Sequence, residues 1–267
     1  MNDIERSANL ARKAVAEAGH IAMRHFRNGH RSWEKGPGQI VTEADIEIDG
    51  FLKKALLEGS PTGTGWLSEE TTDDTDRLDT RRLWIVDPID GTRSFAEGRP
   101  EFTISVALVE NGRPVCGIVL NPATDEWFEA RRGHGATLDG GAVSVTPHKS
   151  IDGASIVVSS NENRRRKFDR MFENADVRSI GSLALKLAFV ASGRFDGFFS
   201  WRKSHDWDIA ASVLLIEEAG GRITDACGEA IRLNQPSPRQ NGLIAAAPAL
   251  QGELVRRSLE NKARNDE

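Results

Sequence analysis

Hydrophobic positions in the first quarter of the chain recur at helical spacing. Between residues 4 and 26, apolar side chains return every three or four positions, which predicts one amphipathic helix of about six turns. Gly29 and the polar run around Gly36-Pro37-Gly38 then break the pattern. Thr42 is the predicted N-cap of a second helix, which ends in a glycine-rich loop at residues 59–65. The buried face of this second helix is expected to contain Ile48, Phe51, Leu52 and Ala55.

From residue 83 the hydrophobic pattern changes to one that is typical of strands. Residues 83–86 form a continuous apolar run, and residues 102–108 alternate well enough to be a second strand. Asn111-Gly112 predicts a tight hairpin into residues 115–120, and residues 127–130 follow as a further strand. The middle of the chain is therefore expected to form a largely antiparallel sheet.

After about residue 150 strands and helices alternate. The predicted strands are residues 156–158 and 196–199, and the predicted helices are residues 182–191, 208–219 and 248–262. No stretch between them is polar enough to be a linker between independent domains. We expect a single domain, 1–267, with approximate halves 1–148 (N-terminal helices and antiparallel sheet) and 149–267 (α/β).

Charge and composition exclude some classes of function. The 267 residues carry a net charge of −5, which argues against general binding to nucleic acid or to a membrane surface. The N-terminus lacks the pattern of a signal peptide, no apolar stretch reaches the ~18 residues of a membrane span, and two cysteines suit a reducing compartment. We expect a cytoplasmic protein. The basic run at residues 164–167 is interpreted as a solvated helix face, with a contact to a nucleotide or polyanion as the alternative.

Candidate chemistry begins directly after the apolar run at residues 83–86. Asp87 and Asp90 stand three residues apart in Asp-Pro-Ile-Asp-Gly-Thr, where two carboxylates are costly unless a cation compensates them. Oxygen ligands favour magnesium, calcium or manganese over zinc. An ordinary turn is the alternative interpretation, because Asp-Pro and Asp-Gly are common turn pairs.

Three other acidic sites also have a non-functional interpretation when each is taken alone. Glu69-Glu70 follows the glycine-rich loop and could be an exposed pair. Asp208 and Asp45 each fall in the first turn of a predicted helix, where an acid complements the helix dipole without further function.

The combination of these acidic motifs, in this order, resembles the inositol monophosphatase family of metal-dependent phosphatases. The resemblance implies a layered α/β/α/β/α sandwich with a large, mainly antiparallel sheet and a second, smaller sheet. Family members are often dimers, so a homodimer is also suggested. The matching pieces are Thr42-Glu43-Ala44-Asp45, Glu69-Glu70, residues 87–92, residues 207–211 and Ala219-Gly220-Gly221.

By that resemblance the chain binds two or three Mg²⁺ ions and is sensitive to lithium. Asp87 would bridge two ions, and a third, weaker ion would be held by Glu69. The implied metal ligands are Glu69, Asp87, the backbone carbonyl of Ile89, Asp90 and Asp208.

The resemblance also implies how the phosphate ester is cleaved. A metal-activated water attacks the phosphorus, and the Thr92 hydroxyl, helped by Glu69 and by Asp45 behind it, takes the proton of that water. The backbone at Gly91 and Thr92 begins a short helix that holds the phosphate oxygens. Asp90 and Asp208 also face the substrate.

Two further residues have alternative interpretations. Lys35 either approaches the phosphate or is a plain surface lysine. Glu70 either lies behind the metal ligands or is exposed.

Substrate assignment is divided between branches of the family. Inositol-specific relatives carry a glutamate seven residues before the aspartate that is Asp208 here, and this chain has Trp201 there. The neighbouring Arg202, Lys203 and His205 are basic candidates for contacts to a more anionic substrate. We expect a small phosphorylated polyol or sugar, with inositol monophosphate first. The alternatives are a 3′(2′),5′-bisphosphate nucleotidase, a histidinol-phosphate or fructose-1,6-bisphosphate phosphatase, and a non-catalytic partner in an RNA or transcription complex.

Overall fold

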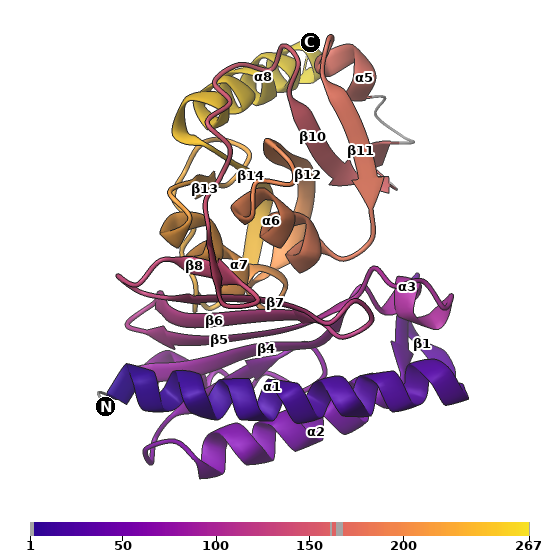
Figure 1. Ribbon diagram of the computed structural model, residues 1–267, viewed down its shortest axis with the longest axis vertical. Coiled ribbons are helices and arrows are strands. Elements are labelled where there is room, and N and C mark those ends of the chain that lie inside the picture. The colour runs from indigo at the N-terminus through magenta and orange to yellow at the C-terminus, as the bar shows by residue number, and fades with distance from the viewer. Residues whose placement is uncertain (1–2, 161, 164–167, 267) are drawn as a thin grey trace.

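Two β-sheets and three helical layers alternate along the long axis of the molecule (Figure 1). The computed structural model describes residues 3–160, 162–163 and 168–266, so the basic run at residues 164–167 lies outside the described residues. The predicted α/β/α/β/α sandwich, with a larger and a smaller sheet, is confirmed. The division of the chain near residue 148 stays a prediction.

The first layer consists of two helices, α1 (Asp3–Asn28) and α2 (Glu43–Glu58), which cover one face of the larger sheet (Figure 1). Both helices were predicted, as was the N-cap at Thr42. The Thr42 hydroxyl accepts from the backbone N–H of Asp45, and the Asp45 carboxylate accepts from the backbone N–H of Thr42 at 2.8 Å. This reciprocal capping box fixes Asp45 at the start of α2.

The larger sheet is antiparallel except for its first pair, β3 and β4, which run parallel. Both faces of β4 are buried, with Leu83 and Ile85 on one side and Trp84 and Val86 on the other, which explains the continuous apolar run. The strands, in spatial order, are β3 (Gly65–Ser68), β4 (Arg82–Asp90), β5 (Thr103–Glu110), β6 (Arg113–Asn121), β7 (Glu126–Arg131), β8 (Ala136–Leu138) and β9 (Gly141–Val143).

The predicted hairpin at Asn111-Gly112 is confirmed. Both residues have positive φ, 49° and 75°, and Glu110 pairs with Arg113 on either side of the turn. Two consecutive residues of positive φ match the twist of the strands they join.

The second sheet has five strands and mixed direction. β10 runs parallel to β11 and β12, whereas β14 is antiparallel to its neighbours. The strands, in spatial order, are β11 (Asp176–Ile180), β10 (Ser155–Ser159), β12 (Gly197–His205), β14 (Arg239–Ala246) and β13 (Arg222–Thr224).

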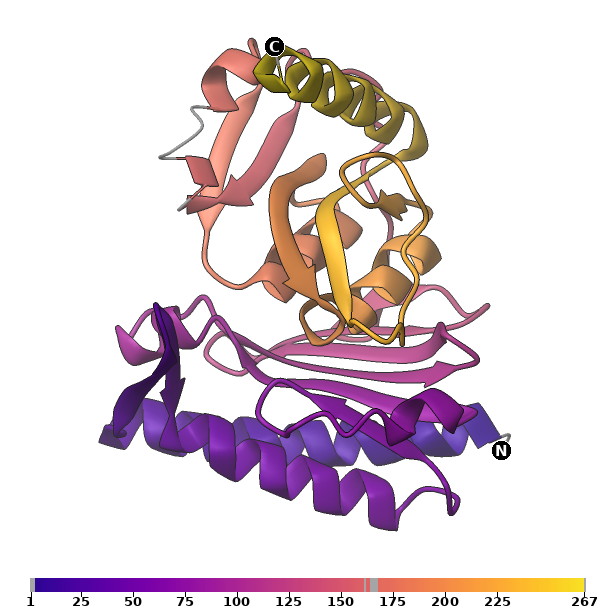
Figure 2. The ribbon, with the colours of Figure 1, turned by 180° about the vertical axis from the view of Figure 1, so that it is seen from behind.

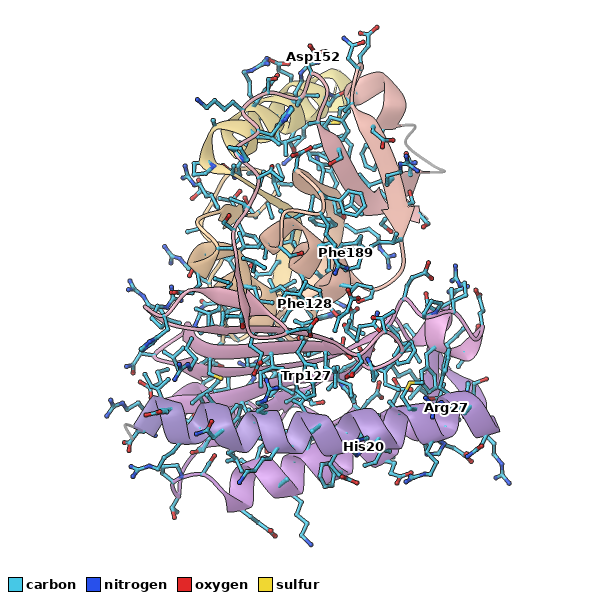
Figure 3. The ribbon with its side chains drawn as sticks, in the orientation of Figure 1. His20, Arg27, Trp127, Phe128, Asp152 and Phe189 are labelled. Carbon is cyan, nitrogen blue, oxygen red and sulfur yellow. The ribbon has the colours of Figure 1, made fainter. Side chains whose placement is uncertain are left out.

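Helices α6 (Leu183–Ala191) and α7 (Asp206–Glu218) fill the space between the two sheets (Figures 1 and 2). Phe128 of β7 and Phe189 of α6 meet there with ring centroids 6.0 Å apart (Figure 3). On the outer face of the smaller sheet lie α8 (Pro248–Asp266) and α5 (Phe168–Met171).

Some elements were not expected from the sequence, and one expected helix begins earlier than predicted. A two-stranded hairpin, β1 (Ser32–Gly36) and β2 (Gln39–Thr42), occupies the polar break after α1. Helix α7 begins at Asp206, two residues before the predicted start, so Asp208 lies in its first turn. A 3₁₀ turn, η1 (Asp76–Asp79), precedes β4, and α3 (Thr92–Ala96) follows it, as the resemblance implied. Among the described residues no helix is long and apolar enough to span a bilayer.

Candidate active site

Three carboxylates from three separate elements converge at one edge of the larger sheet. Glu69 follows β3, Asp87 lies near the end of β4, and Asp208 is in the first turn of α7. One oxygen from each lies within 4.8 Å of the others, close enough to hold one cation. They meet because β3 and β4 are parallel, which brings their carboxyl ends to the same edge, where α7 also begins.

Asp87 is buried among the other acids of this group. Its side chain is buried, with Oδ1 accepting from the backbone N–H of Ile89 at 3.1 Å. Its other oxygen, Oδ2, is buried and has no hydrogen-bond partner among the described residues. Burial, followed by the charges of Glu69, Asp90 and Asp208, holds the pKa of Asp87 well above its ordinary value. An oxygen-only donor set with an unpartnered buried carboxylate oxygen fits a hard divalent cation such as Mg²⁺.

Asp90 is held against the start of α6. Its Oδ2 accepts from the Ser182 hydroxyl and, at 2.6 Å, from the backbone N–H of Ala184. Burial raises the pKa of Asp90, while the hydrogen bond from Ser182 and the Lys186 charge lower it. Both donors bind Oδ2, so neither of them forms a hydrogen bond with the other oxygen, Oδ1.

Thr92 connects the predicted metal ligands to Asp45. Its hydroxyl lies 2.9 Å from the carbonyl oxygen of Ile89 and 3.2 Å from Oδ1 of Asp45. Asp45 is buried, and burial raises its pKa to about 7 against the opposing effect of the hydrogen bonds from Thr42. A carboxylate that titrates near neutrality, one hydrogen bond from a hydroxyl, can accept a proton.

Lys35, on β1, is bound to the acidic pair that follows β3. Its Nζ lies 2.9 Å from a carboxylate oxygen of Glu69 and 2.5 Å from one of Glu70. The Glu70 side chain is only 6% exposed. Lys35 is therefore not a free surface lysine, its approach to the phosphate stays a prediction, and the interpretation of Glu70 as exposed was wrong.

A polar cavity of about 800 Å³ opens beside the carboxylates. Five of the predicted site residues line it: Asp90, Gly91, Arg202, Lys203 and Asp208.

His205 was also predicted to face the substrate but is not among the described residues that line this cavity. Its ring stacks on Trp207 with centroids 4.4 Å apart, and its Nε2 accepts from Nε of Arg239 at 3.0 Å. Burial and the Arg239 charge lower the pKa of His205.

The tryptophan at the position of the family glutamate faces away from the cavity. Trp201 packs on Phe199 at 4.8 Å, and its ring N–H donates to the Ser258 hydroxyl of α8 at 2.8 Å. The large aromatic ring therefore completes the core beneath α8.

Several polar residues that line the cavity were not among the predicted site residues, and Ser182, Lys186 and Ser204 are three of them. Ser182 caps α6 by accepting from the backbone N–H of Leu185 at 3.0 Å, a signal that its place before an apolar run could have supplied. Lys186 had a signal too, because it is the one charged residue in an otherwise apolar helix. Ser204 had no such signal in its local sequence.

Comparison with known proteins agrees with this architecture. The family model described as the inositol monophosphatase family matches residues 3–263. An inositol-1-monophosphatase from Rhizobium meliloti is 40% identical over 82% of this chain and 85% of its own. A fructose-1,6-bisphosphatase/inositol-1-monophosphatase from Thermotoga maritima is 36% identical over 91% of this chain and 93% of its own.

Other relatives have a different name. Nus factor SuhB from Xylella fastidiosa is 32% identical over 93% of this chain and 94% of its own. The crystal structure of the extragenic suppressor protein suhB from Bartonella henselae matches with a TM-score of 0.83 and 30% identity, covering 94% of this chain and 97% of that one. The chain thus belongs to the inositol monophosphatase family and is a phosphoric monoester hydrolase.

Proposed function

We propose that the protein is a Mg²⁺-dependent phosphomonoesterase that acts on a small phosphorylated polyol or sugar, with inositol monophosphate as the first candidate. The observation that carries the proposal is the convergence of Glu69, Asp87 and Asp208 beside a polar cavity, with an Asp87 oxygen left buried and unpartnered among the described residues.

Two or three Mg²⁺ ions would be held by Glu69, Asp87, the Ile89 carbonyl, Asp90 and Asp208. When bound, the ions lower the pKa of a water and stabilise the attacking and leaving oxygens of an in-line displacement. Each of the four carboxylates is in a setting that favours a nearby positive charge. The pKa values of Asp87, Asp90 and Asp208 are raised, and Glu69 is paired with Lys35.

Thr92, Asp45 and Glu69 would move the proton. The Thr92 hydroxyl lies between the Ile89 carbonyl and Asp45, so a proton that it receives can pass to the Asp45 carboxylate. Glu69 would help to orient the attacking water. The free backbone N–H groups at Gly91 and Thr92 would hold the phosphate oxygens at the start of α3.

The names of relatives and the cavity support different substrates. Inositol-1-monophosphatase is the name of the relative from Rhizobium meliloti, which favours a polyol phosphate. Arg202 and Lys203 line the cavity, which favours a substrate with a second anionic group and keeps the 3′(2′),5′-bisphosphate nucleotidase as the second candidate. The name of the Thermotoga maritima relative includes fructose-1,6-bisphosphatase, so fructose 1,6-bisphosphate stays a candidate substrate. Histidinol phosphate has no support from the name of a relative reported above.

We propose that the protein is a cytoplasmic enzyme whose partner is a small-molecule substrate. The net charge of −5 favours a small phosphate ester over nucleic acid. Relatives named Nus factor SuhB make a non-catalytic role in transcription the alternative of a different class. Homodimer formation and inhibition by lithium follow from the family resemblance.

A phosphate-release assay tests the proposal. Purified protein with Mg²⁺ is given inositol monophosphate, adenosine 3′,5′-bisphosphate, fructose 1,6-bisphosphate and histidinol phosphate, one at a time. We expect the highest kcat/KM on inositol monophosphate. A higher value on the adenosine bisphosphate would establish the nucleotidase alternative, and no release from any of them would overturn the proposed activity.

A further inference from the structure

Arg77, in η1 between β3 and β4, is a buried arginine that joins two distant loops. The residue is 1% exposed. Its Nε and Nη2 donate to the two carboxylate oxygens of Asp73 at 2.9 and 2.7 Å, and its Nη1 donates to the side-chain oxygen of Asn234 at 2.6 Å. Nη1 and Nη2 also donate to the carbonyl oxygen of Gln235, at 3.1 Å each. Arg77 therefore fastens the connection between two strands of the larger sheet to the loop between β13 and β14 of the smaller sheet.

Asn234 continues this connection to the first residue of α7. Its side-chain amide donates back to the carbonyl oxygen of Arg77 at 3.3 Å, and its backbone N–H donates to Oδ2 of Asp206 at 2.7 Å. The backbone of Asn234 is left-handed, with φ of 60°, a conformation that asparagine adopts more readily than most residues. A chain of hydrogen bonds thus runs from Arg77 through Asn234 to Asp206.

Asp206 is fully buried, and groups outside α7 bind both of its carboxylate oxygens. Oδ2 accepts from Asn234, and Oδ1 accepts from the side-chain amide of Gln240 at 2.8 Å. The backbone N–H of Asp206 donates to the carbonyl oxygen of Pro238 at 3.0 Å. Three hydrogen bonds therefore attach the first residue of α7 to residues 234–240.

Asp208 depends on the same turn of helix for its direction. It lies two residues after Asp206, and its Oδ2 accepts from the backbone N–H of His205 at 2.6 Å. Its carboxylate therefore moves with the start of α7, whereas Glu69 and Asp87 belong to the larger sheet. A small rotation or shift of α7 would separate Asp208 from these two carboxylates.

Hydrogen bonds are better suited than the apolar core to prevent such a shift. The hydrophobic effect has no preferred direction, so the buried apolar face of α7 would tolerate a small rotation. Hydrogen bonds weaken when their donors and acceptors are misaligned. The contacts of Asp206 therefore set the rotation of α7, and Arg77 ties them to the connection between the strands that lead to Glu69 and Asp87.

We propose that Asp206 is a positioning residue of the metal site, which, together with Asn234 and Arg77, fixes the start of α7 and thereby the direction of the Asp208 carboxylate. The inference deepens the proposed function and rests on it for one point, the role of Asp208 as a metal ligand. It follows that the loss of these hydrogen bonds should lower metal affinity and not only stability.

Mn²⁺ binding to the substrate-free protein, measured by calorimetry, tests this role without any turnover. Mn²⁺ is a suitable probe because it prefers the same oxygen ligands as Mg²⁺. Asp206→Ala removes both acceptor oxygens and should raise the Kd for Mn²⁺ about tenfold, as is typical when a residue that orients a metal ligand is lost. Asp206→Asn keeps one acceptor oxygen and should raise the Kd less.

Asn234→Gly is a second test that leaves Asp206 in place. Glycine adopts positive φ without strain and keeps the backbone N–H that donates to Asp206, but it removes the side chain that binds Arg77. The Kd for Mn²⁺ should rise by a smaller factor than in Asp206→Ala. This variant also tests the inference if Asp206→Ala fails to fold.

Asp196→Ala is the matched control for stability. The Asp196 carboxylate also accepts from a backbone N–H, that of Ser155 at 2.7 Å, and from a side chain, the Thr146 hydroxyl at 2.6 Å. None of these three residues belongs to α7. Asp196→Ala should therefore lower the Tm of the metal-free protein and keep the wild-type Kd for Mn²⁺.

An unchanged Kd in every Asp206 and Asn234 variant that folds, with a lowered Tm as in Asp196→Ala, would make the network purely structural and overturn the inference. The two proposals fail separately. A raised Kd in these variants, with no phosphate release by the wild type in the substrate panel, would overturn only the proposed activity. Phosphate release with an unchanged Kd would overturn only the positioning role. A wild type that does not bind Mn²⁺ would overturn the metal site that both proposals use.

Discussion

At the scale of single residues, the candidate site is a group of acids that repel one another. Asp90 raises the pKa of both Asp87 and Asp208, and Glu69 acts in the same direction on all three. Lys35 and Lys186 offset part of this charge. Such a group stores unfavourable electrostatic energy that a bound cation releases, so substitutions there should affect activity and metal-free stability in opposite directions.

Asp90→Asn should lower turnover by orders of magnitude while the fold stays intact. The amide keeps an oxygen that can accept from Ser182 and Ala184, but it removes one negative charge from the cluster. Thermal melting without metal should therefore give a Tm equal to or above that of the wild type. An Asp90→Asn protein that is unfolded, yet as active per folded molecule as the wild type, would make Asp90 a structural residue.

Asp45 should make the metal-free protein less stable as pH rises. Its pKa is raised from 3.8 in the unfolded chain to about 7 in the fold, so the folded state binds the proton more tightly. This contribution is fully present below about pH 4 and is lost as pH rises to about 7. An asparagine side chain cannot ionise, so the stability of the wild type relative to Asp45→Asn should fall by on the order of 3 kcal/mol over that range. Urea unfolding of both proteins at several pH values measures it, and parallel curves would contradict the raised pKa.

At the scale of elements, the decisive feature is the corner between β4 and α3. Gly91 has φ of 95°, and a Cβ at this position would lie 2.8 Å from the backbone carbonyl oxygen of Glu101. The strand therefore turns into the helix only if residue 91 has no side chain. This corner sets the direction of Asp90 on one side and of Thr92 on the other.

Gly91→Ala should destabilise the protein by about 1–2 kcal/mol through the left-handed backbone alone, with the contact to Glu101 adding to that cost. Activity should fall more than stability, because Asp90 and Thr92 both move with the corner. Urea unfolding and kcat/KM of the same preparations provide the comparison. Gly98→Ala is a matched control, since Gly98 also has positive φ, 69°, but a Cβ added there would meet nothing within 4 Å. The Gly98→Ala protein should lose a similar amount of stability through its backbone and keep its activity.

At the scale of the whole molecule, the two sheets and the helices between them share one hydrophobic core. That core includes residues of β4, β5 and β7 from the larger sheet, of α6 and α7, and of β12 and β14 from the smaller one. Because α6 carries Lys186 and α7 carries Asp208, the packing of this layer positions both the acidic cluster and the far wall of the cavity.

Magnesium removal should abolish activity and leave this architecture in place. The hydrophobic core does not depend on the metal, so a chelator should remove phosphate release without changing the far-UV circular dichroism. Excess Ca²⁺ should inhibit, because it accepts looser geometry and more ligands and so occupies the site without aligning the water. Readdition of Mg²⁺ is the control. Full activity in the chelator would exclude the metal-dependent mechanism.

The sequence by itself determined the elements whose signals are local. The helical spacing before residue 28, the N-cap at Thr42 and the turn at Asn111-Gly112 depend on neighbours a few positions away, and each is present in the fold. The order of the acidic motifs also predicted the family. The β1–β2 hairpin was missed because both strands are short, β1 is mostly exposed, and the apolar residues of β2 are adjacent, so neither strand shows hydrophobic alternation.

Only the tertiary structure decided which side chains from distant elements meet. The pairing of Lys35 with Glu70, the contact of Ser182 with Asp90 and the position of Ser204 in the cavity each join residues that no local pattern relates. The physical reason is that helix and strand periodicity states which face of an element is buried, but not what lies opposite it. The stacking of the two sheets on α6 and α7 supplies that information, and with it the shape and charge of the cavity.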